Sequence, residues 1–160
     1  MMLSWRLSLS ALLLVGCSPA PSADSGNAAA LADTLTGMIE QAYDFGRPGA
    51  VERMTALYAP DDSLVSASDG HITLSADSVR KGIDVFWQSA GRNMRNARWT
   101  WREVHVQRLA PDAAVLTGTW SIPHLTPDGQ EHVIEGAWTA VFRRMSGRWR
   151  IVHEHLSSPP

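Results

Sequence analysis

Residues 147–157 read GRWRIVHEHLS, and this stretch decides how the C-terminal part of the chain folds. Trp149 and Ile151 stand two positions apart, and the same spacing continues through His153 and His155. Because side chains two apart along a strand project from one face of the sheet, the alternation predicts a strand whose apolar face lies in the core. Trp149 is therefore expected in the core. The two histidines are expected on the same face, where imidazole groups raise the question of a binding site.

The sequence from Ala97 onward has the pattern of long strands joined by short turns. Strands are predicted over 97–109, 113–123, 131–144 and 148–157, and the connecting stretches read APDA, TPDG and MSG. Proline, aspartate and glycine at these points favour tight turns. Consecutive long strands with tight turns form an antiparallel meander.

The residues before this meander carry apolar side chains at helical spacing. Helices are predicted over 31–45, 48–58 and 75–91, and a short strand over 63–68. Ser75 is the expected N-cap of the third helix. Helices followed by a meander define an α+β fold, and the simplest packing places three N-terminal helices in the concave face of a strongly curved antiparallel sheet.

The N-terminus reads MMLSWRLSLSALLLVGC over residues 1–17. Arg6 precedes a short apolar run, and the run ends in LVGC, which resembles a bacterial lipoprotein signal. Residues 1–16 are thus predicted to be a signal peptide, and Cys17, the only cysteine, is predicted to carry a lipid that anchors the protein to the membrane. Residues 17–29 are rich in Pro, Ser and Ala and are predicted to be a flexible tether.

Composition and charge limit the classes of function. The chain has 160 residues, of which 44% are hydrophobic and 19% charged, and this is typical of one globular domain, predicted here over residues 30–157. The net charge of −2 gives no electrostatic reason to expect a nucleic-acid partner. The sequence carries no phosphate-binding or dinucleotide motif, so no cofactor is expected. Ser18, not Asp, follows Cys17, which favours the outer membrane, facing the periplasm, as the location.

The residues on the concave face of the predicted sheet follow from assigning the inward positions of one strand and extending the assignment to its neighbours through the register of each hairpin. In 113–123 the apolar set includes Leu116 and Trp120, so these side chains face inward. Across the tight turns the same face receives Trp101, Glu103, His105, Trp138, His153 and His155. Val104 and Val106 are then expected to face outward, where a second subunit would cover them.

The predicted concave face combines apolar walls with a few polar groups, which is typical of a pocket for a small molecule. The predicted ligand-binding residues are Trp87, Trp101, Trp120, Trp138 and His155. His153 is the predicted catalytic acid or base, with Glu103 and His105 as its catalytic partners, because imidazole is suited to proton transfer. The same imidazoles and carboxylate form an alternative metal site for Zn²⁺ or Ni²⁺.

Several stretches of the sequence match a known family. EGAWTAVFRRMSGRWRIVHEHLS at 135–157 resembles the closing hairpin of SnoaL-like proteins in the nuclear transport factor 2-like superfamily. ALYAPDDSLVSASDG at 56–70, FW at 86–87 and RLAPDAAVLTGTW at 108–120 agree with the same family, and the resemblance covers about residues 30–157. It implies a cone-shaped, cystatin-like α+β domain with a pocket, and a homodimer formed through the sheet.

Three functions remain open on the sequence, because the superfamily includes cyclases, isomerases, dehydratases, transport adaptors and association modules. The first is binding of a small apolar or aromatic molecule, which predicts a pocket without convergent acid and base. The second is a proton-transfer isomerase, cyclase or dehydratase that uses His153, which predicts an enclosed cavity with a base and donors aimed at one point. The third is a non-catalytic dimerisation module, which predicts a filled cone and an apolar outer sheet.

Overall fold

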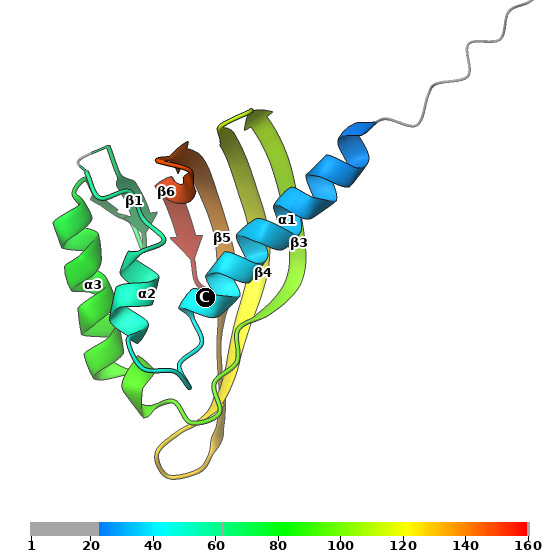
Figure 1. The fold of residues 1–160 in the computed structure, drawn as a ribbon. Helices are drawn as coiled ribbons and strands as arrows, with labels where there is room; N and C mark the ends of the chain where they lie inside the picture. Colours follow the sequence, from blue (N-terminus) through cyan, green and yellow to red (C-terminus); the bar gives the residue numbers. More distant parts are fainter. Residues whose placement is uncertain (1–22, 62, 160) are drawn as a thin grey trace, which may run out of the picture.

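The computed structural model describes residues 23–61 and 63–159, and Figure 1 shows their arrangement. The elements in chain order are α1 (Ala23–Ala42), α2 (Ala50–Thr55), β1 (Val65–Ser68), β2 (His71–Thr73), α3 (Ala76–Ser89), a 3-10 turn η1 (Gly91–Asn93), β3 (Thr100–Ala110), β4 (Ala113–Leu125), β5 (Glu131–Met145) and β6 (Arg148–Ser157). In the described residues, no helix is long and apolar enough to cross a membrane.

The strands form one curved six-stranded sheet in the order β2-β1-β6-β5-β4-β3. Strands β3 to β6 are the predicted antiparallel meander, while β1 pairs with β6 in parallel. Figure 1 shows α1 crossing the sheet in front of β3, β4 and β5, with α2 and α3 side by side at the β1 end. The α+β fold with helices in the concave face of a curved sheet is thereby confirmed.

Tight turns close the hairpins where the sequence predicts them. Ser146 and Gly147 between β5 and β6 have φ values of 48° and 79°, and Asp69 and Gly70 between β1 and β2 have 47° and 78°. Two successive left-handed residues form the hairpin turn whose twist matches that of the strands. The side chain of Ser75 accepts a hydrogen bond from the backbone N–H of Ser78 at 3.1 Å, so the predicted N-cap of α3 is confirmed.

The N-terminal boundary differs from the prediction. Helix α1 begins at Ala23, inside the stretch 17–29 that was expected to be a tether, and the prediction is wrong for residues 23–29. Alanine has the highest helix propensity, and the run NAAALA at 27–32 extends the helix toward the N-terminus. Cys17 and the predicted signal peptide lie outside the described residues.

Irregularities in strand register change which side chains face inward. On β3, Trp101 pairs with Trp120 and Glu103 pairs with Thr119, so Arg102 is an extra residue. On β6, Ile151 pairs with Phe142 and His153 pairs with Val141, so Val152 is an extra residue. Each bulge turns every later side chain of its strand to the opposite face.

These bulges overturn part of the predicted concave face. Glu103, His105, His153 and His155 are exposed on the outer face of the sheet, and the prediction that they line the cone is wrong. Val104 and Val106, expected to face outward, instead pack against the core. Glu154 takes the inward position on β6 and is one of the buried polar residues. Trp149 is in the core as predicted.

Candidate functional site

Five aromatic side chains form a cluster on the concave face, called here the aromatic cluster: Tyr43, Trp99, Trp101, Trp120 and Trp138. Trp99 is its centre. The ring of Trp99 stacks on that of Trp120 with centroids 4.7 Å apart, and its centroid lies 4.5 Å from that of Tyr43. Three of the predicted ligand-binding tryptophans, Trp101, Trp120 and Trp138, are thus brought together, but the central Trp99 was not among the predicted residues.

Glycines in the sheet make room for two of these rings. A Cβ atom on Gly118 would lie 2.5 Å from the carbonyl oxygen of Glu103 and 3.1 Å from the ring of Trp101. A Cβ atom on Gly136 would lie 2.5 Å from a backbone oxygen and 3.2 Å from the ring of Trp120. The indole rings of Trp101 and Trp120 therefore lie directly on bare backbone at these two glycines.

The aromatic cluster contains buried hydrogen-bond donors without partners. In the part of the chain that the structure describes, the indole N–H groups of Trp99, Trp101 and Trp120 are buried and make no hydrogen bond. The indole N–H of Trp138, in contrast, donates to Glu154 Oε2 at 2.9 Å. A buried donor without an acceptor costs about 1–3 kcal/mol, so three of them in one cluster need an explanation. An acceptor atom of a bound molecule or of a buried water would supply it.

Glu154 is a buried carboxyl group beside the aromatic cluster. Its side chain is 2% exposed and accepts hydrogen bonds from the Tyr58 hydroxyl at 3.0 Å, the Trp138 indole at 2.9 Å and the Ser66 hydroxyl at 2.7 Å. Burial raises the pKa of Glu154 above its ordinary value, although the three hydrogen bonds oppose this shift. The ion pairs found among the described residues join other groups, so none of them neutralises Glu154.

Two tyrosines connect Glu154 to the rest of the concave face. Burial, and after it the negative charge of Glu154, raises the pKa of Tyr43 and of Tyr58 well above the ordinary value. Both phenols therefore stay neutral at physiological pH, and Tyr58 acts as a donor to the carboxyl group. Sequence reasoning placed both tyrosines on helices and missed Glu154, because the alternation on β6 pointed that residue outward.

A groove of about 730 Å³ leads from solvent to the aromatic cluster. It runs between the C-terminal half of α1 and the segment before β3, is called here the α1–β3 groove, and is lined by Gly37, Glu40, Gln41, Tyr43, Asp44, Asn96, Ala97, Arg98 and Trp99. Tyr43 and Trp99 belong to both the groove and the cluster. The volume lies in the range of small-molecule sites. The pocket predicted inside the cone is not formed, because the aromatic cluster fills the cone, as was expected of a dimerisation module. The α1–β3 groove is an open surface groove with an aromatic wall.

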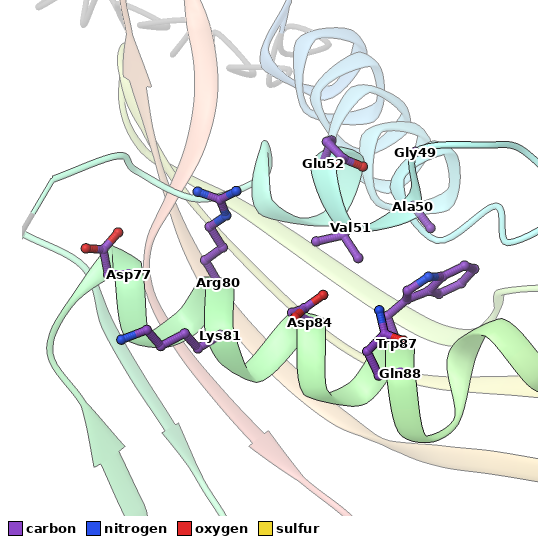
Figure 2. Close-up of a pocket in the computed structure, with 10 residues that line it drawn as sticks. All are labelled: Gly49, Ala50, Val51, Glu52, Asp77, Arg80, Lys81, Asp84, Trp87 and Gln88. Atoms are coloured by element: carbon purple, nitrogen blue, oxygen red, sulfur yellow. The ribbon is translucent and has the colours of Figure 1, made fainter.

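Trp87 lies in a different groove, between α2 and α3. Figure 2 shows this groove of about 590 Å³, with Trp87 and Gln88 at one end, Asp77 at the other, and Arg80 rising from α3 toward α2. The ring of Trp87 lies 5.7 Å from that of Phe45, whose ring lies 6.0 Å from that of Tyr43, so Trp87 reaches the aromatic cluster only through Phe45. Trp87 and the other predicted tryptophans thus do not form one site.

The predicted catalytic residues lie on the other side of the sheet. His105 Nε2 is 2.8 Å from Glu103 Oε1, and both side chains are exposed. His153 and His155 are exposed on β6, so the sheet separates all four groups from the aromatic cluster. In the described ranges, no three His, Cys, Asp or Glu side chains gather in a way that could hold a metal ion.

The curved sheet with helices in its concave face is the architecture of the cone-shaped α+β domains. The family model of the SnoaL-like domain matches residues 36–160, and the chain belongs to this family. A search of curated proteins gave no match.

Solved structures with the same fold share little sequence with this chain. A nuclear transport factor 2-like protein of unknown function from Shewanella oneidensis is 19% identical, with a TM-score of 0.62, over 79% of this chain and 98% of its own. The association domain of the calcium/calmodulin-dependent kinase CaMKII from C. elegans is 18% identical, with a TM-score of 0.63, over 84% and 97%. An uncharacterised cystatin-like protein from Caulobacter vibrioides is 18% identical, with a TM-score of 0.62, over 84% and 92%. At these identities the likeness shows the fold alone.

Proposed function

We propose that this domain binds a small molecule with an aromatic or apolar body and at least one acceptor oxygen, at the α1–β3 groove and the adjoining aromatic cluster. The observation that carries this proposal is the set of three buried indole N–H groups without acceptors. Trp99 is the entry point, because it is 8% exposed, lines the groove and stacks on Trp120. Rotation of its side chain would admit the ligand between the rings.

Binding without chemistry is favoured over proton transfer. Glu154 is the only buried carboxyl group among the described residues, and it already accepts three hydrogen bonds from the protein. The exposed histidines lie across the sheet from the groove. A proton-transfer site needs a base within hydrogen-bond reach of the bound molecule, and neither Glu154 nor the histidines supply one, which leaves Glu40 and Asp44 as the carboxylates that line the groove.

Tryptophan fluorescence tests the proposal with a matched pair of probes. Acetophenone, which carries a carbonyl acceptor, is expected to quench the fluorescence saturably, and ethylbenzene, which lacks the acceptor, is expected to bind more weakly. Trp99→Phe keeps a ring but removes the donor, so it should weaken acetophenone binding by about threefold to tenfold. Trp87→Phe serves as the control for the α2–α3 groove. Quenching by both probes that does not saturate would contradict binding at the α1–β3 groove. So would a loss of acetophenone affinity in Trp87→Phe but not in Trp99→Phe.

The outer face of the sheet favours a second function, assembly of two copies. Two neighbouring rows of outward residues cross the sheet without Asp, Glu, Lys or Arg: Ile72, Ala67, His155, Thr139, Thr117 and His105 form one row, and Val65, His153, Val141, Val115 and Gln107 form the other. Depletion of charge at the centre of a surface is typical of an interface. One fold neighbour, the CaMKII domain, is named as an association domain.

Molar mass in solution tests the assembly proposal. The protein is expected to elute as a dimer in size-exclusion chromatography with light scattering, and Thr139→Arg, which buries a charge at the centre of the face, should give monomers. Val85→Arg is the control, since Val85 is exposed on α3, away from the sheet face. A monomeric wild-type protein would remove this second function.

We also infer from the sequence that Cys17 is lipidated and anchors the domain to the outer membrane. After expression of the full chain in a Gram-negative host, the protein should sediment with outer-membrane vesicles and incorporate labelled palmitate. Cys17→Ser should abolish the label and release the protein from the membrane fraction. An unlabelled wild-type protein would leave an ordinary secretory leader as the explanation of residues 1–16.

A further inference from the structure

We propose that His124 and His132, near the turn of the β4–β5 hairpin, form a binding site for a divalent transition-metal ion, and that Cu²⁺ is the ion bound most tightly. The site is independent of the proposed function, because these two imidazoles line neither the α1–β3 groove nor the aromatic cluster. Three observations support it: the register of the hairpin, the separation of the two rings and the hydrogen bond that orients one of them.

The hairpin places the two histidines opposite each other. His124 on β4 pairs with His132 on β5 in the antiparallel register, so their side chains project from the same face of the sheet. Both line a pocket of about 240 Å³ beside the C-terminal end of α3 and the turn η1. Two ligands that adjacent strands already hold side by side lose little freedom when they bind one ion.

The separation of the rings fits two ligands of a single ion. Their centroids lie 5.0 Å apart at an interplanar angle of 67°. A metal–nitrogen bond of about 2.0–2.1 Å puts the centroid of an imidazole about 3.2 Å from the ion, so two such rings at square-planar to tetrahedral angles have centroids about 4.5–5.2 Å apart. The observed separation lies in this range. His132 is exposed, so its ring can turn until one nitrogen faces the ion.

A hydrogen bond fixes the lone pair of His124. Its Nδ1 atom is 3.0 Å from the backbone oxygen of Ile122. A carbonyl oxygen only accepts, so Nδ1 carries the proton and Nε2 of the neutral ring carries the lone pair. Proteins orient metal-binding histidines in this way, because the hydrogen bond holds the ring and makes the other nitrogen more basic.

The donor atoms, not the surrounding charges, select the ion. Arg95 donates to the carbonyl oxygens of Thr126 and Pro127 at the turn, where Asp128 supplies the opposite charge. Glu131 is exposed at the start of β5 and, as the neighbour of His132 along the strand, projects from the other face. Two imidazole nitrogens, with water in the remaining positions, bind Cu²⁺ more tightly than Ni²⁺ or Zn²⁺ and have little affinity for Mg²⁺ or Ca²⁺.

Calorimetric titration with CuCl₂ tests the site. The full chain carries Cys17→Ser in this experiment, because a free thiolate would itself bind copper. Loss of even a second-shell partner weakens metal binding about 10–100-fold, so His124→Gln and His132→Gln should each lower the affinity at least about tenfold. The EPR spectrum of the Cu²⁺ complex should show coupling to both imidazole nitrogens in the parent protein and to one fewer in each variant.

The matched control removes another pair of histidines. His153 and His155 are exposed on the outer face of the sheet, so His153→Gln/His155→Gln should keep the parent affinity. His132 is exposed, so His132→Gln keeps the test valid if thermal melts show that His124→Gln does not fold. Absence of a copper site in the parent protein would overturn the inference. Unchanged affinity in His132→Gln, or a loss of affinity confined to the control, would also overturn it.

Discussion

At the scale of single residues, Glu154 joins segments that are far apart in the chain. Its Oε2 atom accepts hydrogen bonds from Tyr58 and Trp138, and its Oε1 atom accepts one from Ser66. Glu154→Ala removes the acceptor and leaves three donors, two of them fully enclosed, without partners. We expect the free energy of unfolding to fall by about 3 kcal/mol or more, measured by urea denaturation. Glu131→Gln should change it by less than about 0.5 kcal/mol.

The same carboxyl group makes stability depend on pH. Burial raises the pKa of Glu154 above 4.5, so the folded state binds a proton at pH values where the unfolded state does not. The free energy of unfolding is then expected to rise as the pH falls from neutral, through the raised pKa of the folded state, to about 4.5. Below pH 4.5 the carboxyl group is protonated in both states, so this group adds no further stability. Glu154→Gln cannot titrate, so the difference between wild type and this variant isolates the effect. A difference that is independent of pH would contradict it.

The aromatic residues show what sequence reasoning can and cannot find at this scale. Trp101, Trp120 and Trp138 lie on strands with regular alternation, and their convergence was predicted. Tyr43 and Trp99 fall within a predicted helix and a predicted strand, but in the structure each lies one residue outside its element, beyond the end of α1 and before the start of β3. Only the packing of α1 against β3 brings them to the others.

At the scale of elements, the hairpins and helices follow from local signals, but the faces of two strands do not. The turns at Asp69-Gly70 and Ser146-Gly147 consist of residues that adopt the left-handed conformation. The extra residues Arg102 and Val152 are ordinary strand formers, so no local signal marks either bulge. The apolar spacing of Val104 and Val106 was the one sign that β3 is inverted beyond Trp101.

Glycine in the sheet provides a test of how the rings are seated. Gly118→Ala would place a methyl group against backbone and the ring of Trp101, so we expect a loss of about 1–3 kcal/mol in the free energy of unfolding. Gly82→Ala is the matched control, since a Cβ atom there meets nothing within 4 Å on an exposed helix face, and it should stabilise the protein by about 0.5–1 kcal/mol. Thermal melts of both variants measure the contrast. A neutral Gly118→Ala would show that the ring does not rest on the backbone.

At the scale of the whole molecule, the sheet separates two surfaces with different chemistry. The concave side holds buried rings and one buried carboxyl group, and the outer side holds threonine, valine and histidine. The residues proposed to bind the ligand lie on the concave side, and those proposed to form the dimer lie on the outer side. Ligand affinity and dimer formation are therefore expected to respond to different substitutions. Thr139→Arg should therefore abolish the dimer and leave the affinity for acetophenone unchanged. A fluorescence titration of the monomeric variant measures that affinity. Loss of acetophenone binding together with loss of the dimer would contradict the prediction.

The pairing of β1 with β6 sets the order in which the fold is completed during biosynthesis. Strand β1 is made early, yet its neighbour in the sheet is the last strand of the chain, and the bond from Ser66 to Glu154 spans 88 positions. In a nascent chain that still lacks β6, β1 can pair only with β2, and the β1–β2 hairpin is not yet joined to β5, β4 and β3. Closure of the core must therefore await the synthesis of β6. The two parts of the sheet, the β1–β2 hairpin and the meander from β3 onward, are therefore united only by the strand that is synthesised after all the others.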